Sequence, residues 1–116
     1  GQVTIWNGEM RYQGKIGRDL TVDQGYDAAR MCGLNLIAQV RAACNGDLDR
    51  VKQVVKLGAF VNCVEDFKEH PNVVNGASDL MAEVFGDAGR CTRTNAGVPS
   101  LPLGFAVEID GVFEIE

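Results

Sequence analysis

Two charged residues in the last quarter of the sequence could do chemistry together. Arg93 and Glu108 stand 15 positions apart in the segment GRCTRTNAGVPSLPLGFAVEIDGVFEIE, residues 89 to 116, which predicts two β-strands joined at a proline turn. A guanidinium can bind a carboxylate through two hydrogen bonds, and a glutamate can orient a water or transfer a proton. If these neighbouring strands turn both side chains toward one cleft, the pair predicts a site for a small anionic molecule. The alternative is a surface or intersubunit salt bridge between the two residues.

The charge balance excludes several classes of partner. The chain of 116 residues carries 11 Lys and Arg against 16 Asp and Glu, a formal net charge of −5. Because the basic residues are scattered, we expect no nucleic-acid binding, which depends on clustered positive charge. The longest uncharged run is too short to span a membrane, and no signal segment opens the chain, so we expect a cytoplasmic protein.

The cysteines argue against a metal site. Four cysteines are widely spaced without a C-x-x-C pair, and a single histidine, His70, is available to join them. We therefore expect no metal and buried, reduced thiols, including Cys91. The position of His70 before Pro71 predicts a solvent-exposed helix entry.

The remaining segments must supply the elements that position Arg93 and Glu108. Asn7-Gly8 predicts a tight hairpin turn within residues 1 to 18. Thr21 and Gln24 fit a capping box, followed by an apolar stripe at helical spacing that ends at Asn45-Gly46. We expect Gly33, within this stripe, to allow a close approach of the helix to a sheet.

The second half of the chain adds a strand, a helix and the two C-terminal strands. Residues 51 to 64 alternate with a period of two, which predicts that one face is buried: Val51, Val55, Leu57, Ala59, Val61 and Cys63. A second amphipathic helix follows, with Val73, Ala77 and Leu80 on its apolar face, and stops near Gly86. Two helices can bury their stripes only on one face of a common sheet. The sequence thus predicts a single α+β domain, a two-layer sandwich whose other sheet face, with Glu108, is open to a partner subunit.

Several motifs resemble one family along nearly the whole chain. They are Gly1-Gln2, the segment from 35 to 67, Val74-Asn75, Arg93-Thr94, LPLG at 101 to 104, and Val107-Glu108-Ile109. With them the chain is similar to the reactive-intermediate deaminase family, also called RidA, YjgF or L-PSP endoribonuclease-like. The spacing from Arg93 to Glu108 matches the family as well, and a matched pair is more specific than either residue alone.

This resemblance implies a chorismate-mutase-like fold with a mixed sheet over residues 1 to 116, and a homotrimer with three clefts between subunits. Arg93 would bind the substrate carboxylate, and Glu108 would hold or activate a water. Asn75 would contact the ligand or only bridge backbone nearby, and Gly1 would offer backbone groups. The implied reaction is hydrolysis of reactive enamines and imines, of the 2-aminoacrylate type, to 2-keto acids and ammonia, without metal or cofactor.

The sequence also departs from the family. It begins at Gly1, without the usual preceding strand and its aromatic residue and serine. Asn95 stands where many active members carry Cys or Thr, and GDAGR at 86 to 90 replaces a proline-containing approach to the arginine. These departures predict a divergent subgroup and leave two alternatives open: a binding protein for a keto acid or amino acid without chemistry, and, more weakly, an endoribonuclease.

Overall fold

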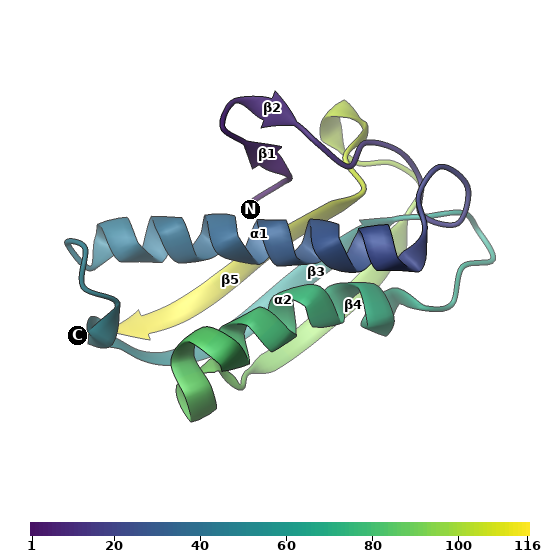
Figure 1. The fold of residues 1–116 in the computed structure, drawn as a ribbon. Helices are drawn as coiled ribbons and strands as arrows, with labels where there is room; N and C mark the ends of the chain where they lie inside the picture. Colours follow the sequence, from purple (N-terminus) through teal and green to yellow (C-terminus); the bar gives the residue numbers. More distant parts are fainter.

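The chain forms two layers, seen in a computed structural model that describes residues 1 to 116 (Figure 1). One layer is a sheet of β3 (Val51–Asn62), β4 (Thr92–Val98) and β5 (Val107–Ile115). The other holds α1 (Val22–Ala43) and α2 (His70–Phe85), which lie side by side across one face of this sheet. The predicted α+β sandwich with both helices on one face is therefore confirmed. None of its helices has the length and apolar character needed to cross a membrane.

The first helix begins and ends where the sequence predicts. The Thr21 hydroxyl accepts a hydrogen bond from the Gln24 backbone N–H at 3.1 Å, and the Gln24 side chain accepts one from the Thr21 N–H at 2.8 Å. Both bonds satisfy donors that a helix start leaves free. At the other end Asn45 and Gly46 take positive φ angles of 54° and 89°, which turn the chain out of the helix.

The two helices approach each other closely through glycines. A Cβ on Gly76 of α2 would lie 2.0 Å from the Tyr26 backbone oxygen of α1, so only glycine fits there. A Cβ on Gly33 would meet the Leu80 side chain at 2.9 Å. The expectation that Gly33 packs on the sheet is wrong: its small size serves the contact with α2.

The sheet order corrects the prediction about the two C-terminal strands. The order is β4-β3-β5, with β4 parallel and β5 antiparallel to β3. Sequential strands β4 and β5 are therefore not neighbours, and β3 lies between them. The connection between them includes the 3-10 turn Pro102–Gly104 and crosses the end of β3.

The central strand contains a bulge that changes which residues are buried. The register with β5 shifts between Val54 and Lys56. Val54 is fully buried, whereas Val55 is 44% exposed. The prediction that Val55 shares the buried face is wrong, because the inserted residue inverts the alternation at that point.

The N-terminal segment attaches to the free edge of β5. Gln2 and Ile109 exchange two backbone hydrogen bonds, of 2.7 and 3.0 Å. The short strands β1 (Ile5–Trp6) and β2 (Glu9–Met10) then form the hairpin predicted at Asn7-Gly8, which projects from the body of the molecule (Figure 1). The Asn35 side chain of α1 anchors the segment by donating to the carbonyls of residues 3 and 5.

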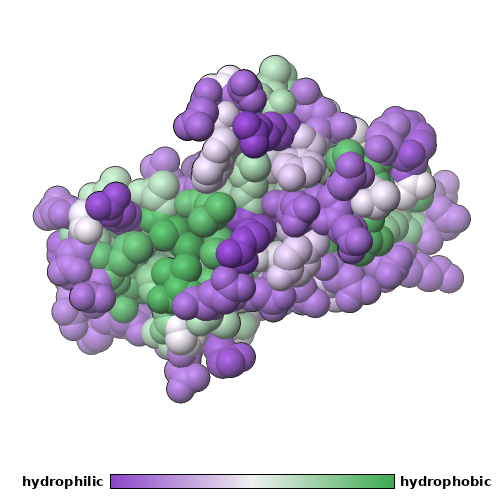
Figure 2. All heavy atoms as spheres, viewed as in Figure 1, coloured by the Kyte–Doolittle hydropathy of each residue, from purple (hydrophilic) through white to green (hydrophobic).

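The face that carries the helices is mainly hydrophilic, and its largest apolar patch lies toward the C-terminal end of α1 (Figure 2). There a shallow groove of about 260 Å³ separates α1 from the end of β5 and includes Leu36, Val40, Phe113 and Ile115. The opposite face of the sheet has no helix over it. It exposes Phe60 and Val112, at 42% and 54%.

Candidate functional site

Arg93 and Glu108 lie on opposite faces of the sheet. Residues paired across neighbouring strands project to the same side. Arg93 pairs with the buried Leu57, on the helix side, whereas Glu108 pairs with the exposed Phe60, on the open side. The hypothesis that both side chains face one cleft within a chain is therefore wrong, and no salt bridge joins them within the chain. The alternative of a salt bridge between Arg93 and Glu108 of different subunits stays a prediction.

The Arg93 guanidinium is held by neutral oxygens of α2. Its Nη1 donates to the Asn75 Oδ1 and to the Ser78 Oγ, each at 2.8 Å, and its Nη2 lies 3.5 Å from the Pro71 carbonyl oxygen. The four ion pairs of the chain all lie elsewhere, so no carboxylate lies within 4.0 Å of this cation. Nε–H and one Nη2–H remain free, and together they form the fork that binds a carboxylate with two hydrogen bonds.

The two α2 side chains that fix Arg93 stand one helical turn apart. Asn75 and Ser78 are separated by three positions, so they share a face of α2, and that face looks toward β4. Asn75 is predicted from the sequence, whereas Ser78 is not. The spacing between them was the signal that could have identified it. The side-chain oxygens of both residues accept hydrogen bonds from Nη1, and these bonds set the orientation of the guanidinium.

Glu108 lies with Gly1 on the other side of the sheet. A Cβ on Gly1 would lie 2.9 Å from the Glu108 Oε2, so the backbone at Gly1 lies against the carboxylate. The Gln2–Ile109 bridge holds the two segments in this position. Glu108 is half-buried, and none of the chain's ion pairs includes it. The structure thus divides the four residues predicted for the site into two pairs, Arg93 with Asn75 and Glu108 with Gly1.

A buried thiol lies behind Glu108. Cys32 of α1 is fully buried and lies 3.6 Å from the Val107 carbonyl oxygen. Burial, with a smaller contribution from the Glu108 charge, raises the pKa of the Cys32 thiol from 9.0 to about 12. A thiol with this pKa stays neutral at physiological pH and is a structural group rather than a nucleophile.

The predictions for the cysteines and for His70 are confirmed only in part. All four cysteines are free, and Cys32, Cys44 and Cys63 are buried, but Cys91 is only half-buried. The expectation that His70 is solvent-exposed is wrong: it is half-buried and lies 3.4 Å from the Cys63 Sγ. Asn95 is half-buried on the same face of β4 as Arg93. No group of three or more His, Cys, Asp and Glu side chains is arranged to hold a metal ion.

The chain belongs to the family described as "YjgF/chorismate mutase-like, putative endoribonuclease", whose model matches residues 1–111. It is 52% identical to Protein TCP17 of Trypanosoma cruzi over 103 residues, which are 88% of this chain and 64% of that relative, so it spans slightly less than two thirds of the relative's length.

Among solved structures, the chain is similar to Atu1372 of Agrobacterium tumefaciens, a protein of unknown function. The TM-score is 0.98 at 44% identity, over 100% of this chain and 74% of that one. Escherichia coli TdcF, solved with bound serine, shares the fold with a TM-score of 0.57 at 19% identity, over 100% of this chain and 76% of that one.

Proposed function

We propose that this protein hydrolyses small 2-imino acids to 2-keto acids and ammonia, in sites assembled between two copies of the chain. The observation that carries this proposal is a pair of opposite charges without partners. The Arg93 cation and the Glu108 anion project from opposite faces of one sheet, and neither has an ion-pair partner within 4.0 Å. Each can meet its complement only on another molecule, either a ligand or a second copy.

A second copy accounts for both surfaces at once. Arg93 lies on β4, which is an edge strand of the sheet, so its free fork lies at the rim of the molecule. Glu108 lies on the uncovered face beside Phe60, which a partner would bury. In a cyclic trimer each interface joins two different surfaces, so the Arg93 rim of one copy would meet the Glu108 face of the next. Three equivalent sites follow.

In such a site, Arg93 would hold the substrate carboxylate through Nε–H and Nη2–H, with Asn75 and Ser78 fixing the guanidinium. The imine carbon is already electrophilic, so attack by a positioned water needs only one proton-transfer group. Glu108 would accept a proton from that water as the C–O bond forms. It would pass this proton to the nitrogen, which takes up the electron pair of the C=N π bond, so that a carbinolamine forms. It would then accept the remaining hydroxyl proton as the C=O bond forms and the C–N bond breaks, and deliver it to the leaving nitrogen, which releases ammonia and leaves the 2-keto acid.

The fold itself can hold a molecule of the required kind. TdcF was solved with serine, an amino acid whose carboxylate is attached to an amine-bearing carbon, as in a 2-imino acid. Because TdcF and this chain share the fold rather than a closely similar sequence, the bound serine supports a ligand of about this size. The roles of Arg93 and Glu108 are tested by the variants below.

The direct experiment is to measure ammonia release from 2-iminopropionate by the wild type and by Arg93→Ala. We expect the variant to lose the rate enhancement while keeping the oligomeric state, measured by light scattering. Arg90→Ala is the matched control, since Arg90 is 75% exposed and its guanidinium lies beside Asp87 at the surface. An unchanged rate of 2-iminopropionate hydrolysis by Arg93→Ala would contradict the proposal.

A second candidate is binding without turnover. Asn95 favours it, because this amide lies beside Arg93 on the helix face of β4, where many active members of the family carry Cys or Thr. Saturable binding of a 2-keto acid that is lost in Arg93→Ala, with no rate above the uncatalysed reaction, would select this candidate over the hydrolase.

A further inference from the structure

A cavity of about 670 Å³ opens where α2 begins, apart from the residues of the proposed hydrolytic site. Three segments surround it: residues 15 to 18, the loop after β3, and the end of β4. Arg93, Asn75, Gly1 and Glu108 do not line it. Its size falls in the range of small-molecule sites, about 300 to 1,000 Å³. Its lining combines cationic and apolar groups, among them Lys15, Arg18, Val64, Phe67, His70 and Pro99.

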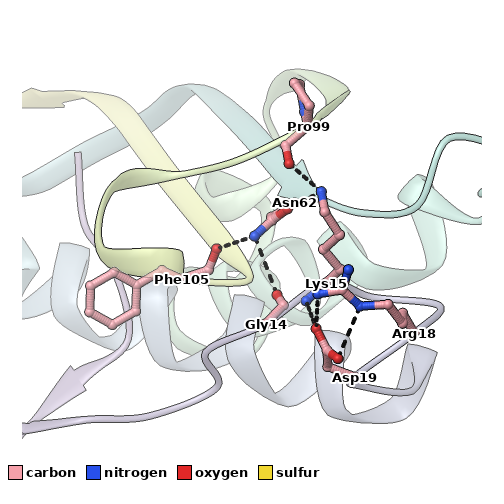
Figure 3. A network of polar contacts seen from close by, with 7 residues as sticks. All are labelled: Gly14, Lys15, Arg18, Asp19, Asn62, Pro99 and Phe105. Carbon is pink, nitrogen blue, oxygen red and sulfur yellow. Dashed lines mark hydrogen bonds and ion pairs between the residues drawn. The ribbon is translucent and has the colours of Figure 1, made fainter.

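The cationic group of interest is the Lys15 ammonium. It donates to the Asn62 Oδ1 at 3.1 Å and to the Pro99 carbonyl oxygen, and both acceptors are uncharged (Figure 3). Lys15 is half-buried and belongs to none of the ion pairs of the chain. Asp19, beside it in the same view, accepts from the Lys15 backbone N–H and from Arg18 instead. One ammonium hydrogen thus remains free, on a partly buried charge that lacks an anion.

The Lys15 position is fixed by a buried amide. Asn62 is 4% exposed, and its Nδ2 donates to the Phe105 carbonyl at 3.2 Å and to the Gly14 carbonyl at 3.4 Å (Figure 3). These bonds orient the Oδ1 that receives Lys15. The ammonium is therefore held in place by the protein rather than free to sample solvent, which reduces the entropy that a ligand must offset on binding.

The lining also includes an imidazole and an aromatic ring. The His70 Nε2 lies 3.4 Å from the Cys63 Sγ, and the Phe67 ring meets the His70 ring edge-on at a centroid distance of 5.1 Å. Gly97 makes room for this arrangement, since a Cβ there would lie 2.5 Å from the His70 Nε2. Cys63 and Phe67 thus hold the ring against the cavity, and Phe67 adds an apolar surface.

We propose that this cavity is a second ligand site, which binds a small carboxylate with an aromatic body. The carboxylate would supply the anion that Lys15 lacks, and the ring would pack on Phe67 and the apolar groups beside it. Glu65, which also lines the cavity, is exposed and makes no ion pair with Lys15, so it leaves the ammonium available. This inference is independent of the proposed hydrolysis, because no residue of that site takes part.

The chain offers a direct probe of the cavity, because His70 is its one histidine. Its ring resonances in a proton NMR spectrum are therefore assigned without ambiguity. We expect benzoate, added at constant pH, to shift them with saturation, at a dissociation constant on the order of 1 mM for a ligand of this size. Benzyl alcohol, which keeps the ring without the charge, should bind at least tenfold more weakly. Equal effects of the two probes, or no saturable shift with benzoate, would overturn the proposal.

Two variants locate the binding. Lys15→Gln keeps a donor for Asn62 and Pro99 but removes the charge, so benzoate affinity should fall about tenfold, as expected for loss of one charge-assisted hydrogen bond. Arg93→Ala should leave the benzoate titration of His70 unchanged. Conversely, Lys15→Gln should leave 2-iminopropionate hydrolysis unchanged. If Arg93→Ala, rather than Lys15→Gln, weakens benzoate binding, the ligand occupies the other site and the inference fails.

Discussion

Arg93→Lys separates the charge of Arg93 from its shape. In the structure Nη1 is used by Asn75 and Ser78, each at 2.8 Å, and the free edge of the guanidinium consists of Nε–H and Nη2–H. A lysine ammonium can satisfy the same two oxygens and keeps the positive charge. It cannot also present two parallel donors to a carboxylate. The variant should therefore fold and assemble normally but hold the substrate poorly.

The size of the effect follows from the bonds lost. A hydrogen bond to a charged group contributes about 1.5 to 3 kcal/mol, and we expect Arg93→Lys to lose one of the two in the fork. This corresponds to a decrease in kcat/KM for 2-iminopropionate of roughly 10- to 150-fold. The assay is ammonia release over a range of substrate concentrations. Urea unfolding should show a change in unfolding free energy below about 1 kcal/mol.

Arg90→Lys is the matched control, because it makes the same change at an arginine that is 75% exposed. It should leave kcat/KM unchanged. A value of kcat/KM for Arg93→Lys within about twofold of wild type would refute the argument from the free fork. A loss of activity that merely accompanies a loss of stability would refute it too.

Three further predictions test neighbouring features of the fold and the site. Asn75→Asp would give Arg93 an anionic partner in its own chain at the 2.8 Å contact, so KM for 2-iminopropionate should rise with little change in kcat. Gly76→Ala would place a Cβ 2.0 Å from the Tyr26 carbonyl oxygen and should lower the unfolding free energy in urea by about 2 to 4 kcal/mol; a stable variant would contradict this packing. Because folding raises the pKa of Cys32, the neutral thiol stabilises the folded state below pH 9.0, and this contribution is lost as pH rises toward about 12. The free energy of unfolding of Cys32→Ala should therefore fall less than that of the wild type over this pH range.

Local features of the fold could be predicted from the sequence because each depends on a few adjacent residues. The capping box at Thr21 and Gln24 and the hairpin at Asn7-Gly8 both follow from local hydrogen-bond and backbone preferences, and both are present. The open sheet face with Glu108 was predicted from the alternation along β5. In each case the pattern in the sequence is the physical cause of the structure.

Strand order and the bulge could not be predicted in the same way. Alternation states which face of a strand is buried, but not which strand lies beside it, so β3 between β4 and β5 was missed. The bulge near Val55 follows from the pairing with β5, which the β3 sequence alone does not contain. The prediction placed His70 correctly at the start of a helix, but its partial burial was missed because its environment consists of Cys63, Phe67 and Gly97, which only the folded chain brings together.

The same limit applies to the candidate site. The family resemblance selected Arg93, Asn75, Glu108 and Gly1, and the roles proposed for them remain predictions. These residues form two pairs on opposite sides of the sheet because of the strand order. The resemblance did not state which residues of β4 and β5 pair with which residues of β3. This division is the reason to place a complete site between two copies of the chain.

Complementation between two inactive variants tests this arrangement most directly. Arg93→Ala and Glu108→Gln should each be inactive as pure oligomers. When they are co-expressed with different tags, every mixed cyclic trimer should contain one interface with both native residues, and so about one third of the wild-type activity. Recovery near this level in the doubly tagged fraction is the predicted result. If the mixed oligomers remain as inactive as the two variants alone, the site is not shared between copies and the account is contradicted.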